Sequence, residues 1–555
     1  MEYLNILFLN SISSLIIILN GITFKKLLGF KRYKENFLES GLYGLILISL
    51  VTFTANFFLK ISSFVSLIIL LLPIAFIIKE IFPYKNKIIY HSIIIGLISS
   101  FIMFFDNTNR PDAGLYHLPF INIINDSKII IGSANLEFRY GHTSILQYLS
   151  AAFNNIVFSE KGILLPLANT FSIVVLYFLK LIKNNSGILK IIFFLFLFNI
   201  LYSMNRYSGL GNDDPGHMFY YLALCNLIYY YFENSKIDLK KNVIIFSIFA
   251  YFIKPFLLLV FLFPLLMLID KKIKLFSRLN IICLIVVLLW TFKSILISSC
   301  AFYPISVTCI KNLQWSTFNS KVSNPDRVNR TSEAWAKDWP NNKKQMSQKQ
   351  YVKNFNWLVT WRDNHFKIVI KEIFPQVLLV IILLIFGGNI FKENKLKRIN
   401  FLLLIFTLIS SLIWFLKFPI YRYGQAYIIS FINILFLNLL IFDIKLRYLK
   451  TINIFKFINI ILIMCFIGIS LKSFSRIYKN INNKYFNFPW PKMYSYTNKN
   501  YKNINIVVNL KNGKLLYYKP YPYTLCMYSK SPCTSNVDVG EIKKNIKLGY
   551  KIYFY

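Results

Sequence analysis

The sequence predicts an all-α polytopic membrane protein of about 12 transmembrane helices, followed by a small β-rich or mixed extracytoplasmic C-terminal domain. Of the 555 residues, 56% are hydrophobic and 18% are aromatic. Apolar runs repeatedly reach the roughly 20 residues that cross a hydrocarbon core. Because lipid offers the backbone no hydrogen-bond partner, only helices or closed barrels can span it, and runs of this length favour helices.

The transmembrane domain is expected over residues 1–472 and the C-terminal domain over residues 473–555. Tyr3–Ile22 has no basic n-region and no Ala-x-Ala cleavage site, so we expect a membrane helix here and not a signal peptide. Thr143–Phe158 is short and contains Asn and Gln, which indicates an interfacial or partly inserted helix. Lys254-Pro255 interrupts the apolar segment Val243–Ile269, which indicates a broken, re-entrant pair. The other spans are expected near 3–22, 37–59, 61–79, 88–105, 162–180, 190–204, 218–232, 281–299, 366–388, 400–416, 427–442 and 454–472.

The distribution of basic residues predicts which side of the membrane each loop occupies. Short loops rich in Lys and Arg stay in the cytoplasm. By this rule the N-terminus, the C-terminal domain and the loops 106–142, 205–217 and 300–365 lie on the extracytoplasmic side of a bacterial inner membrane. The loops assigned to the cytoplasm are Lys25–Glu35, Lys79–Lys87, Asp270–Arg278, Lys392–Arg398 and Asp443–Lys456.

The net charge of +40 does not indicate a nucleic-acid partner. Lys, Asn, Ile, Phe and Tyr are all abundant together, as an AT-rich coding sequence produces, and much of the charge lies in the short loops that set topology. We therefore expect membrane lipid as a partner, and no nucleic acid. The two long polar segments are also basic, which favours contact with anionic lipid or lipid-phosphate head groups.

The seven cysteines support the same orientation. Three lie in apolar spans, where a thiol behaves as a small hydrophobic group. The other four form two close pairs in segments assigned to the outside, where an oxidising compartment favours disulfides. The expected pairs are Cys300 with Cys309 and Cys526 with Cys533.

The tail combines strand and turn signals. Asn505–Val508 and Leu515–Tyr518 are rich in strand-forming residues and flank Lys511-Asn512-Gly513, which predicts a hairpin. We expect a small cap stabilised by the second cysteine pair.

The first outer loop carries an unusual concentration of titratable groups for a chain with only 23 acidic residues. Asp112 precedes Tyr116 and His117 by four and five residues, and Arg139 and His142 follow in the same loop. An Asp here could abstract a proton from a sugar hydroxyl or hold a cation. The alternative is that Asp112 only caps the helix that begins after it.

The second outer loop places Asp213 and Asp214 at the start of a helix, with His217 close behind. Two adjacent carboxylates can bind a divalent cation such as Mg²⁺ or Mn²⁺ that bridges phosphates. Capping of the following helix explains the same pattern.

Arg422 lies between aromatic residues where two apolar spans meet on the outer side. Its planar guanidinium suits bidentate binding of phosphate. The alternative is an interfacial side chain that extends to the head-group region.

The absence of Walker, GxGxxG and HExxH motifs counts against a nucleotide-driven machine.

Taken in order, several motifs resemble an uncharacterised family of bacterial polytopic membrane proteins. The architecture is similar to that of the GT-C glycosyltransferases, which use polyprenyl-phosphate-linked sugars. That resemblance implies Asp112 as the base, Asp213 and Asp214 as secondary acidic residues, and Arg422 as the contact to the donor phosphate. This chain has several helices before its first acidic loop, which departs from the common GT-C pattern. The motifs are Asp112…Leu115-Tyr116-His117, Gly132…Asn135-Leu136…Arg139-Tyr140-Gly141…Ser144, Phe302-Tyr303-Pro304, Trp315, Trp335-Ala336-Lys337, Pro419…Arg422-Tyr423 and Cys526…Ser531-Pro532-Cys533-Thr534.

The sequence therefore leads us to expect an inverting glycosyltransferase that moves a sugar from a polyprenyl-phosphate donor to a glycan acceptor at the periplasmic face. A transporter or flippase of lipid-linked glycans is one alternative, and a non-catalytic partner in polysaccharide assembly is another. The enzyme requires Asp112, Asp213 or Asp214, and Arg422 to face one shared site. The other two functions do not.

Overall fold

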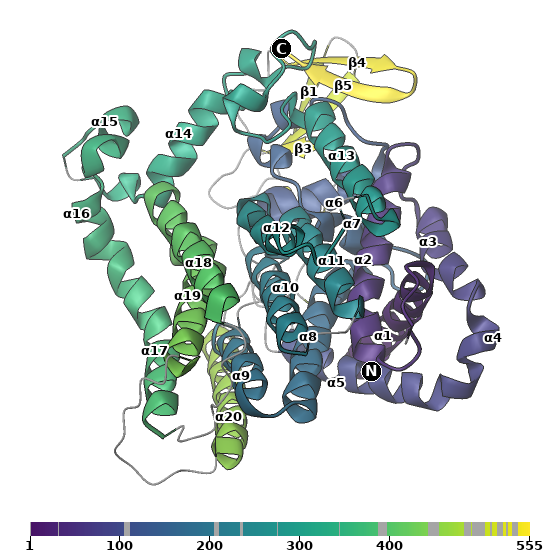
Figure 1. Ribbon diagram of the computed structural model, residues 1–555. Helices are drawn as coiled ribbons and strands as arrows, with labels where there is room; N and C mark the ends of the chain where they lie inside the picture. The colour runs from purple at the N-terminus through teal and green to yellow at the C-terminus, as the bar shows by residue number, and fades with distance from the viewer. Residues whose placement is uncertain are drawn as a thin grey trace.

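The computed structural model is mostly helical, with a few short strands near the C-terminus (Figure 1). It describes residues 2–31, 33–104, 112–204, 210–233, 237–274, 276–342, 344–386, 397–441, 454–481, 490, 505–510, 513–518, 525–528, 531–534 and 542–555. The start of the first outer loop, residues 205–209 of the second, two of the expected cytoplasmic loops and much of the tail therefore lie outside the described residues.

Within these residues, nine helices are long and apolar enough to cross a membrane, which makes the chain a multi-pass membrane protein. Three shorter apolar helices, 63–75, 187–202 and 255–269, accompany them. The long helices cover Leu4–Leu27, Phe37–Asn56, Ile78–Phe104, Glu160–Asn184, Arg278–Ser298, Leu358–Ile385, Arg398–Lys417, Tyr421–Leu440 and Lys456–Lys479.

The N-terminal half combines long helices with shorter ones. The first ones are α1 (Glu2–Leu27), α2 (Phe37–Asn56), α3 (Ser63–Ala75), α4 (Ile78–Ile81), α5 (Lys85–Phe104), α6 (Leu118–Asp126), α7 (Ile145–Ala151), α8 (Leu165–Asn184), α9 (Gly187–Tyr202) and α10 (Asp213–Glu233). The later ones are α11 (Ile237–Ile253), α12 (Leu262–Ile269), α13 (Arg278–Ser298), α14 (Pro325–Ala336), α15 (Gln348–Val352), α16 (Leu358–Trp361), α17 (Lys367–Phe386), α18 (Lys397–Lys417), α19 (Tyr421–Ile441) and α20 (Ile454–Asn480).

Helices α1 and α2 cross at a pair of glycines. A Cβ on Gly21 would lie 1.6 Å from the Ser40 carbonyl oxygen, and one on Gly44 would lie 1.8 Å from the Ile17 carbonyl oxygen. Small residues allow helix backbones to approach this closely in membranes, where lipid gives no hydrophobic drive to association.

The break predicted at Lys254-Pro255 is confirmed. Helix α11 ends at Ile253, a 3₁₀ turn covers Pro255–Phe261, and α12 follows. The chain reverses there, so that the start of α11 lies close to the residues that follow α12. Tyr231 donates a hydrogen bond to the Asp270 carboxylate at 2.8 Å, and Lys240 donates to the Lys272 carbonyl at 2.7 Å.

The short helix expected within 143–158 is α7, which covers only Ile145–Ala151 and is buried along its whole length. Ser144 caps its first turn. Helix α7 packs against α2, α6, α8 and α11.

The C-terminal residues form the predicted β structure. The hairpin pairs β1 (Asn505–Leu510) with β2 (Gly513–Tyr518), while Lys511 and Asn512 of its turn lie outside the described residues. Strand β3 (Cys533–Thr534) pairs with β2 in parallel. A second hairpin is formed by β4 (Lys543–Lys547) and β5 (Tyr550–Phe554).

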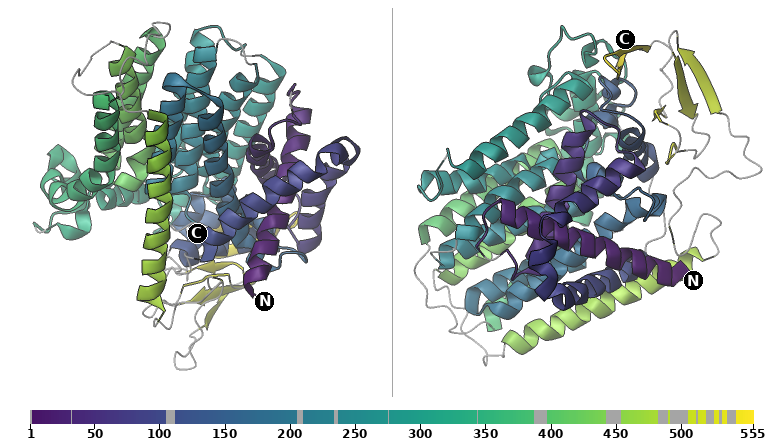
Figure 2. Two further views of the ribbon diagram at one scale, coloured as in Figure 1. Left: turned by 90° about the horizontal axis from the view of Figure 1, so that it is seen from below. Right: turned by 90° about the vertical axis from the view of Figure 1, so that its right-hand side faces the viewer.

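The C-terminal strands lie at one end of the helical body, and the N-terminal end of α1 lies at the same end (Figure 2). Strand β5 packs directly on the first outer loop (residues 106–142), where the Tyr553 amide donates to the Ile131 carbonyl at 2.9 Å. Tyr140 of that loop donates to the Cys533 carbonyl at 2.5 Å.

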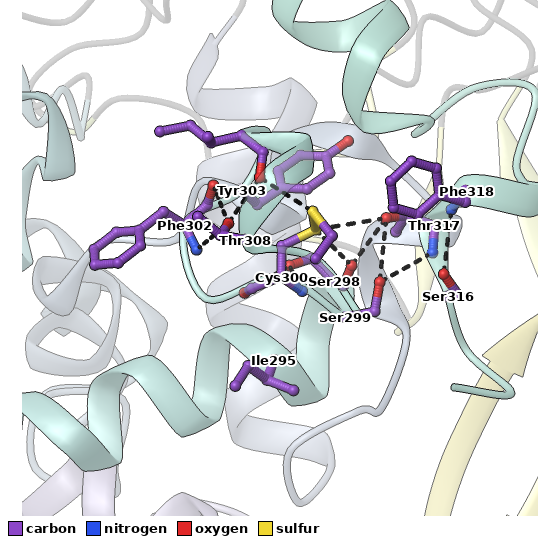
Figure 3. The surroundings of a disulfide bond; sticks show 12 residues. Ile295, Ser298, Ser299, Cys300, Phe302, Tyr303, Thr308, Ser316, Thr317 and Phe318 are labelled. Atoms are coloured by element: carbon purple, nitrogen blue, oxygen red, sulfur yellow. Dashed lines mark hydrogen bonds between the residues drawn. A yellow bond between two sulfur atoms is a disulfide. The ribbon is translucent and has the colours of Figure 1, made fainter. Parts of the chain in front are cut away.

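Both predicted disulfides are present, Cys300–Cys309 and Cys526–Cys533. Figure 3 shows Cys300 just after the end of α13, beside hydroxyl side chains of the helix end and of the following loop. Thr317 donates a hydrogen bond to the Ser298 carbonyl at 2.9 Å, which ties that loop to the helix end.

Candidate functional site

Four separate chain segments meet near the start of α19. Asp112 precedes a π-helical turn at Ala113–His117, and Asp213 begins α10. Lys254 lies at the reversal between α11 and the 3₁₀ turn that precedes α12. Arg422 is in the first turn of α19. Together with Tyr423, these residues form the Arg422 cluster.

Arg422 lies between two carboxylates. Its Nη1 is 3.9 Å from Asp112 Oδ2, and its Nε is 3.9 Å from Asp213 Oδ2. The guanidinium carbon is also 5.5 Å from the ring centre of Trp335 on α14 and 5.0 Å from that of Tyr423. The side chains of Arg422 and Asp112 are 44% and 46% exposed, so this side of the cluster is open to a ligand.

Lys254 is the charged residue of this cluster that the sequence did not predict as a site residue. It forms an ion pair with Asp213, and its ammonium lies 4.1 Å from the ring centre of Tyr423. The sequence signal is visible, since Lys254 is a cation within an apolar segment, although the same position also marks the helix break before Pro255. Asp213 therefore has two cationic neighbours, Lys254 and Arg422.

The comparison with family models identifies the family. A model described as "Domain of unknown function (DUF8201)" matches residues 4–429 of the chain. The chain belongs to this family. No curated protein and no solved structure matches the chain.

The DUF8201 match runs from α1 into the first turns of α19, so it contains every residue of the Arg422 cluster. It ends before Cys526 and the C-terminal strands. The cluster is thus built entirely from the part of the chain that the DUF8201 family shares.

His217 supports the backbone of the cluster. Its Nε2 is 2.8 Å from the carbonyl oxygen of Arg422 and donates to it. The imidazole is buried, and its Nδ1 has no hydrogen-bond partner among the described residues. His217 of α10 therefore helps to fix where α19 begins, and with it the direction of Arg422.

Tyr116 and His117 pack beside the cluster, with their ring centres 4.1 Å apart. Burial lowers the pKa of His117 to about 3, against the opposing charge of Asp213. Burial, followed by the charge of Asp112, raises the pKa of Tyr116. Both side chains are therefore neutral at physiological pH.

Arg139 and His142 lie in a different group of contacts. Arg139 donates to the Glu137 carboxylate at 2.9 Å, and the ring of His142 lies 5.3 Å from that of Tyr303. Burial lowers the pKa of His142 to about 4 and raises that of Glu137, while the charge of Arg139 lowers both. In the described residues, the polar and ring contacts of Arg139 and His142 are with these neighbours and with Phe138. None of these contacts is with a residue of the Arg422 cluster.

The described residues around Asp213 and Asp214 do not provide the ligand set that is typical of a metal site. Among the described residues, no group of three or more His, Cys, Asp and Glu side chains is placed to hold an ion. Asp213 already has two cations beside it, and Asp214 acts electrostatically on Lys254. The divalent cation stays a prediction of the sequence.

Proposed function

We propose that this protein is an integral-membrane glycosyltransferase that moves a sugar from a polyprenyl-phosphate donor to a glycan acceptor at the outer face of a bacterial inner membrane. The observation that carries the proposal is the position of Arg422 between Asp112 and Asp213, with Lys254 beside them. In the Arg422 cluster, the two cations can stabilise a leaving phosphate, and a carboxylate can accept a proton.

In the proposed reaction, Asp112 takes the proton of the acceptor hydroxyl. At the same time the oxygen of that hydroxyl attacks the anomeric carbon of the donor sugar. The bond from that carbon to the phosphate oxygen breaks, and the lipid phosphate leaves with the electron pair. Arg422 and Lys254 stabilise the negative charge that develops on it. Arg422 and Asp112 are 3.9 Å apart, which is too long for a hydrogen bond. A phosphate can therefore replace Asp112 as the partner of Arg422.

An apolar groove on the same helical hairpin supports a lipid-linked donor. It has a volume of about 350 Å³ and begins at Leu258, four residues beyond Lys254. Tyr427 of α19 donates to the Phe256 carbonyl at 2.7 Å, which holds this hairpin against the helix that carries Arg422. The phosphate would bind at Lys254 and Arg422 while the prenyl chain extends along the groove. The groove is lined by Leu258, Leu259, Phe261, Leu262, Pro264, Leu265 and Leu268.

Two substitutions in the purified protein and in cells test this function. Arg422→Ala should weaken binding of polyprenyl phosphate in detergent micelles by about tenfold or more, since a charge-assisted hydrogen bond contributes about 1.5–3 kcal/mol. Asp112→Asn, with expression confirmed, should lower sugar transfer to the surface glycan by about 10²–10⁴-fold.

The exposed ion pair of Arg362 with Asp363 supplies matched controls. Arg362→Ala and Asp363→Asn should leave binding and glycan unchanged. A normal glycan in the Asp112→Asn strain would overturn the role of Asp112 as the base. If Arg422→Ala alone removes the glycan while Asp112→Asn does not, the protein moves lipid-linked glycans and does not transfer sugars.

A further inference from the structure

The first turn of α7 lies where this helix packs against α6 of the first outer loop. Gln147 Oε1 accepts a hydrogen bond from the Ser144 backbone amide at 2.9 Å, and Ser144 Oγ accepts one from the Leu146 amide at 3.3 Å. This reciprocal arrangement is a capping box, which satisfies backbone donors at a helix start. Ser144 and Gln147 are buried, so their hydrogen bonds do not exchange with water.

The capping box fixes the orientation of the Gln147 amide. A backbone amide can only donate, so the Gln147 atom that faces Ser144 must be the oxygen. The nitrogen of the same amide then faces His117, and Nε2 lies 3.4 Å from His117 Nδ1. Because the Gln147 nitrogen is a donor, His117 Nδ1 has to be the acceptor.

An acceptor at Nδ1 places the proton of a neutral imidazole on Nε2. His117 is 2% exposed, and burial keeps it neutral. The two ring nitrogens lie on opposite sides of the imidazole, so the Nε2–H of His117 points away from α7. In the described residues, Gln147 is the only side chain that hydrogen-bonds this ring.

The other neighbours of His117 belong to the candidate site. The Tyr116 ring lies against it with the two ring planes tilted by 40°, and the negative charge of Asp213 acts on it from the start of α10. A neutral N–H here can donate to a phosphate or hydroxyl oxygen without adding a charge that would compete with Arg422 for Asp112.

We propose that Gln147 is a positioning residue that holds His117 as the neutral Nε2–H tautomer, so that His117 offers a hydrogen-bond donor to an oxygen-rich ligand of the Arg422 cluster. The role toward a ligand rests on the proposed function, whereas the tautomer does not.

Gln147→Glu is the decisive variant. A carboxylate can still accept from the Ser144 amide, since Ser-x-x-Glu is also a capping box. Its second oxygen now faces His117 Nδ1 and can only accept, so the proton moves to Nδ1 and a cation becomes favourable. The matched control is Gln350→Glu in the exposed capping box of Ser347, where Gln350 Oε1 accepts from the Ser347 amide at 3.3 Å.

The measurement is the ¹⁵N spectrum of histidine-labelled full-length protein in micelles, with the His117 signals assigned by their loss in His117→Asn. We expect a protonated Nε2 and an unprotonated Nδ1 in the wild type and in Gln350→Glu. Gln147→Glu should show a protonated Nδ1 and titrate at a higher pH. An Nδ1–H signal in the wild type would overturn the proposal even if the variant fails to fold.

Binding of polyprenyl phosphate tests the second part. Above the pH at which His117 titrates in this variant, Gln147→Glu should weaken it by about tenfold or more, because the neutral Nδ1–H tautomer has no donor at Nε2, while Gln350→Glu should bind as the wild type does. Unchanged binding with the tautomer reversed would overturn the donor role. A wild-type protein that does not bind polyprenyl phosphate would contradict the proposed function, whereas the spectrum would still decide the tautomer.

Discussion

At the scale of single residues, burial decides what the histidines of the outer loops can do. Four of the five histidines fall in segments that the sequence places outside, which favoured a titratable site. In the structure His117 and His142 are instead held neutral, because a buried imidazolium would lose its hydration. Which loop residues are buried depends on the packing of distant segments over them, and no local pattern contains that information.

These two histidines predict how stability depends on pH. The folded-state pKa values, about 3 for His117 and about 4 for His142, lie below the usual value near 6.5, so the unfolded chain binds protons first as the pH falls. Each should lower the free energy of unfolding by about 1.4 kcal/mol per pH unit below pH 6.5, until its folded-state pKa is reached.

Thermal unfolding of the purified protein between pH 8 and pH 4.5 checks this prediction. The midpoint should fall below about pH 6.5, and less steeply in the double variant His117→Asn/His142→Asn. An unfolding midpoint that decreases with pH as steeply in the double variant as in the wild type would contradict the prediction.

At the scale of elements, the cystine segment, residues 525–528 and 531–534, packs against the loop that carries the candidate site. The Met527 amide donates to the Gly114 carbonyl at 2.9 Å. A Cβ on Gly114 would lie 2.3 Å from Met527 Sδ and 2.8 Å from Leu525 Cβ. Gly114 is thus required by a contact with residues about four hundred positions away, which the sequence pattern around it does not reveal.

Gly114→Ala should therefore displace the cystine segment and destabilise the protein by about 1–3 kcal/mol, the usual cost of overpacking. The measurements are the midpoint of thermal unfolding and the rate of proteolysis within residues 525–534. Gly211→Ala is the matched control, because a Cβ there meets no atom of the described residues within 4 Å. Equal behaviour of the two variants would show that the contact at Gly114 is not made in solution.

At the scale of the whole molecule, the helical body has two distinct ends. The termini, the C-terminal strands and the region of the first outer loop share one end (Figure 2). The Tyr231–Asp270 contact marks the opposite end of the hairpin of α11 and α12. The positive-inside rule assigns the first end to the outside.

Thiol labelling of intact cells checks that assignment. Arg330 and Lys274 are both exposed basic residues, on α14 and in the loop before α13. With the three free cysteines replaced by Ser, Arg330→Cys should react with a membrane-impermeant maleimide in intact cells. Lys274→Cys should react only after the membrane is opened. The reverse result would place the Arg422 cluster on the cytoplasmic side.

The sequence by itself determined the multi-pass helical class, the break at Lys254-Pro255, the C-terminal strands and the two disulfides. Each of these depends on local length, composition or spacing, which the chain displays directly. The candidate site was predictable only in part: Asp112, Asp213 and Arg422 stood out as charges in an apolar chain. Their contacts with one another and with Lys254 depend on helix packing between segments that are distant in sequence. Only the tertiary structure could decide those contacts, because burial and ion pairing depend on three-dimensional neighbours.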